Sequence, residues 1–494
     1  MNIEDIIEFC DPVSVHGKTS GPAGALHLDS RNISDGDIFI AVKGTQTDGH
    51  LFIENAIEKG AETVIIDQEQ EFSGDVTVIQ VKDTRALLSP LAQKLAGNPA
   101  KKLRIIGITG TNGKTTVATL VWQLLRSMGQ NTGLLGTVSK KINDRDLESR
   151  LTTADPVELA SDMKLMVENN CEYLVMEVSS HALHQKRVHG IPFEVAAFTN
   201  LTLDHLDYHK NMEEYARAKK ILFDELSETS WAVVNFDDPK GEWIIKDTRA
   251  KILDFSLRKQ ALVTIQVQQT SALGTRMKVA GIDVQTPLTG LFNVYNAAEA
   301  MLICTALGFD GKLVAENLSR CSGAPGRMEK VTSPEKADRQ PVVIVDYAHT
   351  PDALENVAST LAELKKPGQD LVIIFGCGGD RDKSKRPEMA KIAETYGDRV
   401  VVTSDNPRTE NPDEIIKDIL KGFSDDFSPQ PVTSRKEAIQ KTVLESSVND
   451  IILIAGKGHE TYQETDGKRI HFDDREIARK ALSERNGHLN HEVH

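Results

Sequence analysis

Short apolar runs separated by amphipathic stretches repeat along most of the chain. In the first hundred residues, β-prone runs lie between helical patterns at Asp37–Val42, Thr63–Ile66 and Val76–Val81. Further runs predict strands at Arg104–Ile108, Tyr173–Val178, Val195–Asn200 and Trp231–Asn235. A last set predicts strands at Pro341–Val345, Asp370–Phe375, Arg399–Thr403 and Asp450–Ala455. Strands that alternate with helices in this way are typical of parallel α/β sheets.

Two breaks in this alternation indicate domain boundaries. The chain has 494 residues, which is more than one hydrophobic core usually organises. The turn sequence Gly97-Asn98-Pro99 closes the first set of strands, and the polar segment Thr332–Gln340 separates the second set from the third. We therefore predict three α/β domains, at residues 1–100, 101–335 and 336–494.

A phosphate-binding loop follows the first strand of the middle segment. Residues 107–116 read Gly-Ile-Thr-Gly-Thr-Asn-Gly-Lys-Thr-Thr, and a helical pattern follows them. The general pattern has a glycine five positions before Gly113, where this chain has Ile108, so the loop is a variant form. Backbone N–H groups and a helix N-terminus would converge on a phosphate, with Lys114 as a point charge and the Thr115 hydroxyl available to Mg²⁺.

Two other stretches of the middle segment carry candidate ligands. Glu177 ends an apolar strand, where a P-loop enzyme commonly holds Mg²⁺ from the side opposite the loop threonine. The stretch 199–209 contains two histidines and two aspartates, which favours a metal or phosphate site, and the imidazole of His205 could serve a second cation. On spacing alone, Lys219 would be a solvated lysine on a helix.

The four strands of the last segment each run into a motif. These motifs are Asp-Tyr-Ala-His-Thr-Pro, Gly-Cys-Gly-Gly-Asp-Arg, Ser-Asp-Asn-Pro-Arg and Gly-Lys-Gly-His-Glu. Ligands of open α/β sheets bind outside the carboxyl ends of the strands. We therefore expect the four motifs to line a single crevice.

Composition narrows the classes of function. A net charge of −15 disfavours nonspecific binding to nucleic acid, which needs a basic face. No apolar stretch approaches a membrane span, and the acidic start of the chain lacks the pattern of a signal peptide, so we expect a cytoplasmic protein. The scattered cysteines fit reduced thiols better than disulfides or a zinc site: Cys10, Cys171, Cys304, Cys321 and Cys377.

Four motifs in one order give the chain a resemblance to a known family. Thr-Gly-Thr-Asn-Gly-Lys-Thr-Thr at 109–116, Met-Glu-Val-Ser-Ser-His-Ala-Leu at 176–183, Asp-His-Leu-Asp-Tyr-His at 204–209 and Pro-Gly-Arg-Met-Glu at 325–329 resemble the Mur ligases. The resemblance spans nearly the whole chain. It implies an N-terminal domain that binds a uridine nucleotide, a central P-loop ATPase-like domain with a parallel sheet, and a Rossmann-like C-terminal domain.

The resemblance also implies a reaction. ATP would phosphorylate the side-chain carboxylate of D-glutamate in UDP-N-acetylmuramoyl-L-alanyl-D-glutamate, and an amine would attack the acyl phosphate to form an amide, ADP and phosphate, in peptidoglycan precursor synthesis. Within the family, Ser-Asp-Asn-Pro-Arg at 404–408 resembles the enzymes that add meso-diaminopimelate. An arginine fork suits the distal carboxylate of diaminopimelate, which lysine lacks. We expect a monomer with no nucleic-acid partner and no membrane span.

Several residue roles are implied by the resemblance alone. Thr115 and Glu177 would hold one Mg²⁺, and His205 and Lys219 a second, with Lys219 carbamylated by CO₂ to an anionic ligand. The catalytic set would be Lys114, Glu177, His205 and Lys219. ATP would meet Gly110, Thr111, Asn112, Gly113, Lys114, Thr115, Thr116, Asn293, Arg327, Asp346 and His349.

The two other substrates have their own implied sets. The UDP-sugar dipeptide would meet Leu28, Ser30, Thr45, Gln46, Thr47, Thr152, Thr153, Ser179, Gln185 and Arg187. Diaminopimelate would meet Arg381, Asp405, Asn406, Pro407, Arg408, Gly456 and Glu460. Glu460 could pair with the distal ammonium group.

Two alternatives remain. Folylpolyglutamate synthetase shares the central architecture and also makes an acyl phosphate, but it resembles this chain only from about the P-loop onward, so the first hundred residues count against it. A P-loop ATPase or nucleotide sensor would hydrolyse ATP without an acceptor amino acid, and it gives no purpose to the Asp-Asn-Pro-Arg loop.

Overall fold

The computed structural model describes residues 1–45, 47–70, 75–147, 149, 151–206, 208–333 and 340–489. The chain forms two compact units, one of Met1–Val263 with Leu302–Phe309 and the other of Thr264–Met301 with Asp310–His494. None of the described helices is both long and apolar enough to cross a membrane.

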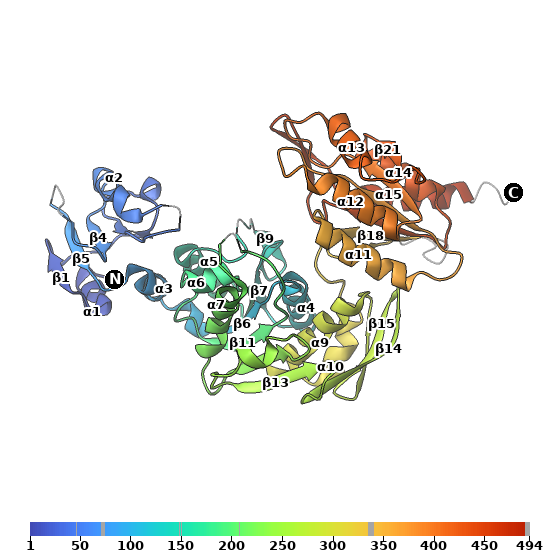
Figure 1. The fold of residues 1–494 in the computed structure, drawn as a ribbon. Coiled ribbons are helices and arrows are strands. Elements are labelled where there is room, and N and C mark those ends of the chain that lie inside the picture. Colours follow the sequence, from blue (N-terminus) through green and yellow to red (C-terminus); the bar gives the residue numbers. More distant parts are fainter. Residues whose placement is uncertain are drawn as a thin grey trace. The chain divides into compact units, whose positions relative to one another are not determined.

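The first unit begins with a small sheet in the order β1-β5-β4-β3-β2 (Figure 1). Its strands are β1 (Ser14–His16), β2 (Leu26–His27), β3 (Ile38–Ile40), β4 (Thr63–Ile66) and β5 (Thr77–Gln80), all parallel except β1. Alternate side chains of these strands pack on α1 (Ile3–Cys10) and α3 (Thr84–Leu95) on one face and on α2 (Ile53–Glu58) on the other. Short 3₁₀ turns lie at Ser30–Asn32, Gly49–Phe52 and Pro99–Lys102. The three strands predicted here are confirmed, each within two residues.

A larger sheet completes the first unit. The order of its strands is β13-β12-β11-β6-β10-β7-β8-β9, and β13 to β7 are parallel. The strands are β6 (Arg104–Thr109), β7 (Thr132–Leu135), β8 (Lys140–Ile142), β9 (Arg145–Leu147), β10 (Tyr173–Glu177), β11 (Phe193–Phe198), β12 (Trp231–Asn235) and β13 (Lys251–Ser256). The helices are α4 (Lys114–Ser127), α5 (Pro156–Glu168), α6 (Ser180–His184), α7 (Met212–Asp224) and α8 (Gly241–Ile244). The four predicted strands are confirmed, whereas β7 to β9 and β13 were not predicted.

One face of this sheet is covered by α5, α6 and α7. Met163, Leu183 and Phe223 of these helices belong to the same buried cluster as Met176 of β10 and Phe198 of β11. The helices therefore hold the carboxyl ends of β10 and β11 in place, and both strands end in motifs that the sequence singled out.

The second unit opens with an antiparallel meander of β14 (Val263–Ser271), β15 (Gly274–Val279) and β16 (Ile282–Thr286). Two helices follow, α9 (Leu291–Ala306) and α10 (Gly311–Leu318), and α10 packs against β16. The meander was not predicted, since one of its faces is largely solvent-exposed and its sequence is rich in Gln and Thr.

The rest of the second unit is a doubly wound sheet in the order β17-β18-β22-β19-β20-β21 (Figure 1). Its strands are β17 (Glu329–Val331), β18 (Val342–Asp346), β19 (Leu371–Phe375), β20 (Arg399–Thr403), β21 (Gln430–Val432) and β22 (Ile451–Ala455), and only β17 is antiparallel. A separate hairpin joins β23 (Tyr462–Thr465) and β24 (Lys468–His471).

Helices cover both faces of this doubly wound sheet. Leu453 of β22 shares a cluster with α11 (Pro351–Leu364), α12 (Lys385–Tyr396) and α13 (Pro412–Leu420). Its neighbours Ile452 and Ile454 point to the opposite face and pack with α14 (Arg435–Glu445) and α15 (Asp474–Leu489). The four strands predicted here are confirmed, and with them the Rossmann-like architecture.

Candidate functional site

The phosphate-binding loop joins β6 to α4, as the sequence predicted. Gly110 has a φ of 153°, and a Cβ atom there would lie 1.8 Å from Oγ1 of Thr199. Only glycine permits so close an approach. The Lys114 ammonium curls over the loop and donates to the carbonyl oxygens of Gly110 (2.9 Å) and Thr111 (2.8 Å). The loop's own carbonyl oxygens therefore hold the ammonium group of its lysine.

The segment after β11 braces the loop from the side. The Asn112 N–H donates to Oδ1 of Asn200 (2.9 Å), and the Thr199 hydroxyl donates to the Asn112 carbonyl (2.6 Å). The hydroxyl of Thr111 lies 3.1 Å from the hydroxyl of Tyr215 on α7. Thr116 is buried in the first turn of α4. The loop conformation is thus fixed by residues outside the motif that defines it.

Glu177 lies beside the loop because β10 pairs with β6 in a register that sets Glu177 opposite Ile108. Its carboxylate is 1% exposed and accepts the Thr115 hydroxyl at 3.0 Å. It also accepts the N–H (2.8 Å) and the hydroxyl (3.1 Å) of Thr137. The structure therefore brings together the two residues expected to share one Mg²⁺. A buried carboxylate next to a hydroxyl offers the oxygen ligands that Mg²⁺ prefers.

Lys219 is not the solvated lysine that helical spacing alone predicted. Its side chain is 1% exposed, and its Nζ donates to the Gly110 carbonyl (2.8 Å) and lies 4.5 Å from the centre of the Tyr215 ring. Burial lowers the pKa of Lys219 well below the usual range of a lysine, and the nearby charge of Lys114 lowers it further. A lowered pKa favours the neutral form of the amine, which is the nucleophilic one.

His205 stands at the edge of a cluster of aromatic rings. It has a φ of 53°, its side chain is 43% exposed, and its ring centre lies 4.9 Å from that of His181 and 5.9 Å from that of Tyr215. The deeper His209 contacts the Ser180 hydroxyl through Nε2 (3.0 Å), and burial, aided by positive neighbours, lowers its pKa to about 4. Tyr215 contacts both His205 and Lys219, so the two expected ligands of a second cation flank one ring. Among the described residues, no cluster of three or more His, Cys, Asp or Glu side chains could hold a metal ion, and the expected set contains only two of these types.

The residues expected to meet the dipeptide form one network behind Glu177. The Thr153 hydroxyl donates to the Glu177 carbonyl (2.9 Å) and accepts the Ser179 N–H (3.1 Å). Arg187 donates to the Thr153 carbonyl (2.9 Å) and, with two nitrogens, to Oε1 of Gln185 (2.7 and 3.0 Å). The Thr152 hydroxyl lies 3.0 Å from that of Thr137. The remaining uridine-site candidates lie in the N-terminal sheet domain: Leu28, Thr45 and Thr47 are exposed, Ser30 is buried, and Gln46 lies outside the described residues.

The other nucleotide candidates belong to the second unit. Asn293 is buried and donates to the Thr289 carbonyl (2.9 Å). Asp346 ends β18 and accepts the N–H groups of Met328 (2.7 Å) and Ala348 (2.8 Å), and burial raises its pKa. The Arg327 guanidinium lies 4.9 Å from the centre of the Tyr347 ring, and Nδ1 of His349 lies 2.8 Å from the Tyr347 carbonyl oxygen.

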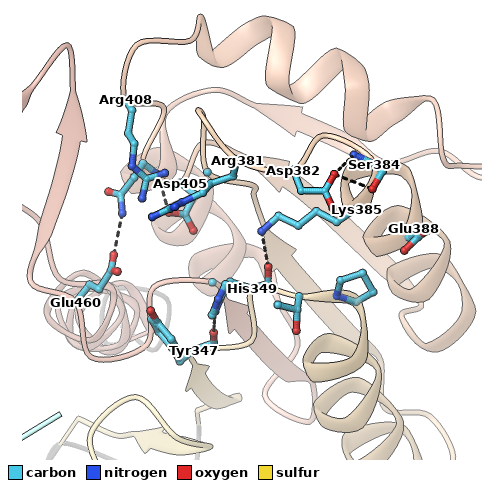
Figure 2. Close-up of a pocket in the computed structure, with 15 residues that line it drawn as sticks. Tyr347, His349, Arg381, Asp382, Ser384, Lys385, Glu388, Asp405, Arg408 and Glu460 are labelled. Carbon is cyan, nitrogen blue, oxygen red and sulfur yellow. Dashed lines mark hydrogen bonds between the residues drawn. The ribbon is translucent and has the colours of Figure 1, made fainter. Parts of the chain in front are cut away.

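The carboxyl ends of β18, β19, β20 and β22 enclose a pocket of about 540 Å³ (Figure 2). Residues from all four motifs line it, which confirms the predicted crevice. Six of the seven expected acceptor residues are among its lining: Arg381, Asp405, Asn406, Arg408, Gly456 and Glu460. Pro407 is not, and its carbonyl accepts the Glu410 N–H instead (3.0 Å).

Arg408 enters this pocket from an unusual backbone conformation. Its φ is 52°, a left-handed value that side chains other than glycine rarely adopt. The hairpin β23–β24 holds it there: the Arg408 N–H donates to the Glu464 carbonyl (3.0 Å), and the Asp466 N–H donates to the Arg408 carbonyl (2.7 Å). The guanidinium donates to the Gly379 carbonyl (2.7 Å) and lines the pocket together with Glu460 (Figure 2).

Sequence reasoning missed three side chains that lie at these candidate sites. Thr137 contacts both oxygens of Glu177, Tyr208 joins His184 (2.9 Å) to Gln185 (3.0 Å), and Lys457 is fully buried beneath the acceptor pocket. Thr137 follows the end of β7, so a correct prediction of that strand would have pointed to it. Tyr208 lies inside a motif that was read for its histidines and aspartates.

Comparison with known proteins agrees with this geometry. Residues 24–95 match the Mur ligase family, catalytic domain, residues 108–304 match the Mur ligase middle domain, and residues 326–458 match the Mur ligase, glutamate ligase domain. A UDP-N-acetylmuramoyl-L-alanyl-D-glutamate--2,6-diaminopimelate ligase from Cytophaga hutchinsonii is 43% identical over 486 residues, which are 98% of this chain and 99% of that protein.

Solved structures extend the likeness to the fold. A structure of a UDP-N-acetylmuramoyl-L-alanyl-D-glutamate--2,6-diaminopimelate ligase is 33% identical, with a TM-score of 0.74, covering 98% of this chain and 99% of that one. The folylpolyglutamate synthase of Mycobacterium tuberculosis, complexed with ADP and AMPPCP, has a TM-score of 0.58 at 20% identity and covers 75% of this chain and 92% of its own. The folate enzyme therefore shares the fold over only part of the length. Because three Mur ligase domains match along the chain and its relatives align with it from end to end, the chain belongs to the Mur ligase family.

Proposed function

We propose that the protein is an ATP-dependent ligase that adds meso-diaminopimelate to the D-glutamate side chain of UDP-N-acetylmuramoyl-L-alanyl-D-glutamate. The observation that carries the choice of acceptor is the charge pattern of the pocket at the ends of β18, β19, β20 and β22. The carboxylates of Asp405 and Glu460 line it together with the guanidinium groups of Arg381 and Arg408. A diamino dicarboxylic acid offers ammonium and carboxylate groups at both of its ends. The relatives that align over their full length are named for the same acceptor, which supports the proposal.

The chain's own residues assist the phosphoryl transfer by compensating negative charge. A carboxylate oxygen of D-glutamate attacks the γ-phosphorus of ATP, and ADP leaves. Lys114 must move from the carbonyls of Gly110 and Thr111 to the phosphates. Its positive charge there offsets the negative charge that builds up on the nucleotide oxygens during the transfer. The amine then attacks the acyl carbon, and phosphate leaves with the former carboxylate oxygen. No protein nucleophile is required.

Mg²⁺ fits the residues that the structure assembles at Glu177. Thr115 and Glu177 would hold it, and bound there it would polarise the phosphate oxygens. Thr137 donates to both oxygens of Glu177 and so keeps the carboxylate turned toward the Thr115 hydroxyl. His205 and Lys219 are the proposed ligands of a second ion.

The second ion requires Lys219 to become an anion. We propose that its neutral amine adds to CO₂ and loses a proton to give a carbamate. The lowered pKa of Lys219 supports this, because only the unprotonated amine has a lone pair for the reaction. We expect Lys219→Ala to lose activity that bicarbonate does not restore but a short carboxylic acid partly rescues. Wild-type activity in Lys219→Ala would exclude the carbamate.

The remaining assignments belong to the same proposal. The UDP-sugar would bind residues 1–100, and the acceptor would bind residues 336–494. ATP would bind residues 101–335, which include Asn293 and Arg327, together with Asp346 and His349. The enzyme would act in the cytoplasm as a monomer, during peptidoglycan precursor synthesis.

The decisive experiment measures amide formation from the UDP-sugar dipeptide, ATP and Mg²⁺, with meso-diaminopimelate or L-lysine as acceptor. We expect product with diaminopimelate only. Arg408→Ala should lower kcat/KM for diaminopimelate by about tenfold to a hundredfold, because charge-assisted hydrogen bonds contribute about 1.5–3 kcal/mol. Arg479→Ala, which changes an exposed arginine of α15, is the matched control.

Each other outcome has a separate meaning. A preference for lysine would keep the ligase and refute the role of Arg408. ATP hydrolysis without product from either amine would favour the ATPase alternative.

A further inference from the structure

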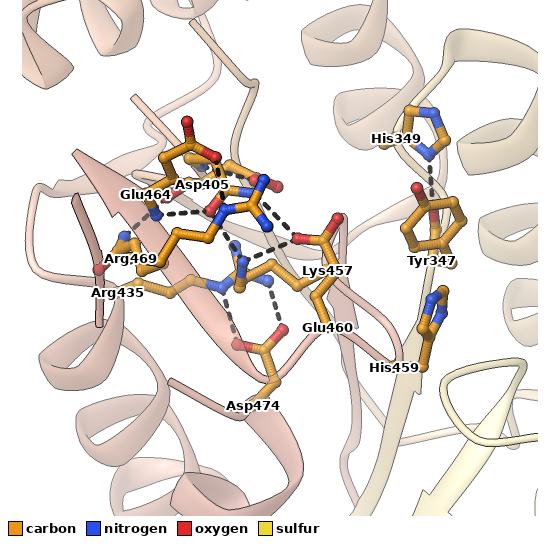
Figure 3. A network of polar contacts seen from close by, with 12 residues as sticks. Tyr347, His349, Asp405, Arg435, Lys457, His459, Glu460, Glu464, Arg469 and Asp474 are labelled. Atoms are coloured by element: carbon orange, nitrogen blue, oxygen red, sulfur yellow. Dashed lines mark hydrogen bonds and ion pairs between the residues drawn. The ribbon is translucent and has the colours of Figure 1, made fainter. Parts of the chain in front are cut away.

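A fully buried lysine lies directly beneath the acceptor pocket. Lys457 follows β22 in the Gly456-Lys457-Gly458 turn, and its side chain is 0% exposed. Its Nζ donates to Oδ1 of Asn406 (3.1 Å) and to Oε2 of Glu460 (3.0 Å) and lies 5.3 Å from the centre of the Tyr462 ring (Figure 3). Burying an ammonium group is costly unless it is paired, and here both hydrogen-bonding partners are residues that line the pocket.

The first partner is locked in orientation. Oδ1 of Asn406 accepts from the Lys457 ammonium and from the Glu464 N–H (3.0 Å). Both are donors, so the amide cannot turn its NH₂ group toward them. Nδ2 must therefore face the other way, where it donates to Oε2 of Glu460 (2.9 Å).

The two oxygens of Glu460 consequently differ. Oε2 takes hydrogen bonds from Lys457 and Asn406, whereas Oε1 has no hydrogen-bond partner among the described residues. The Glu460 side chain is 17% exposed and lines the pocket, so the unengaged oxygen is left for a ligand.

A second buried cation, Arg435, holds the backbone segments around Lys457, Asn406 and Glu460. Arg435 forms an ion pair with Asp474 (2.8 and 2.7 Å) (Figure 3). It also donates to the carbonyl of Ala455 (3.0 Å), the last residue of β22, and to that of Ser404 (3.4 Å), which follows β20. It thereby ties the segment that carries Lys457 to the one that carries Asn406. The separation of the two segments is set by the fold and does not depend on a ligand.

We propose that Lys457 is a positioning residue for the acceptor amino acid. Its ammonium holds Oε2 of Glu460 and the Asn406 amide, so that Oε1 of Glu460 is presented to an ammonium group of the acceptor. Lys457 touches neither the acceptor nor the reacting atoms. This inference rests on the proposed function, because it assigns the pocket to a diamino acid.

The test replaces Lys457 with Met, whose unbranched side chain is one atom shorter and can neither donate a hydrogen bond nor carry charge. We expect the KM for diaminopimelate to rise by about tenfold to a hundredfold, from the loss of a charge-assisted hydrogen bond at Glu460. Because the acyl phosphate forms elsewhere, kcat at saturating diaminopimelate and the KM values for ATP and the UDP-sugar dipeptide should change by less than about threefold. Lys417→Met is the matched control, since it breaks an exposed Lys–Glu pair at the same spacing, Lys417 with Glu414 (2.6 Å).

The alternatives are separable. If Lys457 had a merely structural role, its replacement would change all three KM values or would change kcat alone. Either result would overturn the inference. An unchanged KM for diaminopimelate would overturn it as well. If Lys457→Met does not fold, the same KM and kcat values are measured for Lys457→Gln. Glutamine also lacks the charge, but it retains an N–H donor. If the wild-type protein makes no amide with diaminopimelate, the proposed function fails, whatever Lys457 does.

Discussion

Glu299 is a carboxyl group buried in α9 without a counter-charge, and its replacement by glutamine should stabilise the protein. The residue is 1% exposed, and its Oε1 has no hydrogen-bond partner among the described residues. Burial alone raises its pKa well above the usual value of 4.5. The folded state therefore keeps a proton on this group at a pH where the unfolded chain has released it.

The size of the effect follows from proton linkage. Above pH 4.5, each further pH unit costs the folded state about 1.4 kcal/mol for as long as the buried carboxyl stays protonated. Stability from this group is thus fully present below pH 4.5 and is lost as the pH rises toward the raised folded pKa. The 2.5 pH units between 4.5 and 7 limit the loss at pH 7 to at most about 3.4 kcal/mol, and Glu299→Gln removes it with almost no change in shape.

The assay is urea unfolding of the wild type and Glu299→Gln at pH 5, 6, 7 and 8. The free energies of unfolding should diverge as the pH rises, by at most about 1.4 kcal/mol per pH unit, with the variant the more stable and the two proteins closest at pH 5. Glu316→Gln, on the exposed face of α10, should follow the wild type at every pH. A gap that stays constant with pH, or one that favours the wild type, would refute the reasoning.

Three further predictions concern other polar side chains. Thr137→Val loses the hydroxyl donor to Glu177 but keeps the N–H, so the Mg²⁺ concentration for half-maximal activity should rise about tenfold; an unchanged Mg²⁺ titration would contradict it. The pKa of His209 is lowered from 6.5 to about 4 in the folded protein, so as the pH falls the histidine of the unfolded chain is protonated first. The wild type should therefore lose stability between pH 6.5 and 4. His209→Gln should lose less, which a comparison of Tm at pH 7 and pH 5 would measure. Asp474→Asn leaves the charge of Arg435 buried without its ion-pair partner and should lower the free energy of unfolding in urea by about 3–5 kcal/mol. The double variant Arg435→Met with Asp474→Leu should recover most of this loss. A double variant no more stable than the single one would count against the prediction.

Strands with a continuous apolar run were predictable to the residue. Thr63–Ile66, Trp231–Asn235 and Arg399–Thr403 begin and end where the sequence indicated. Such strands are covered on both faces in a parallel sheet, so their apolar signal is uninterrupted. The acceptor pocket was predictable for the same reason, since its lining follows directly from the strand ends.

The elements that were missed lack this signal. Every residue of β24 is exposed, and β23 has no fully buried residue, so the hairpin that holds Arg408 has no apolar periodicity. The burial of Lys219 and Lys457 was equally hidden, because helical spacing or a glycine-rich turn places a residue along the chain but does not reveal what packs over it. Only the assembled fold shows which lysines are enclosed.

The left-handed backbone at Arg408 has a consequence for how acceptor choice could change. A residue with a Cβ costs roughly 1–2 kcal/mol in this conformation, whereas glycine has no such cost and asparagine tolerates it well. Replacing Arg408 with either residue would therefore abolish the guanidinium fork and relax the main chain in one step. A library selected for heat resistance alone should drift away from arginine at this position, and it would keep arginine only if growth also depended on the diaminopimelate product.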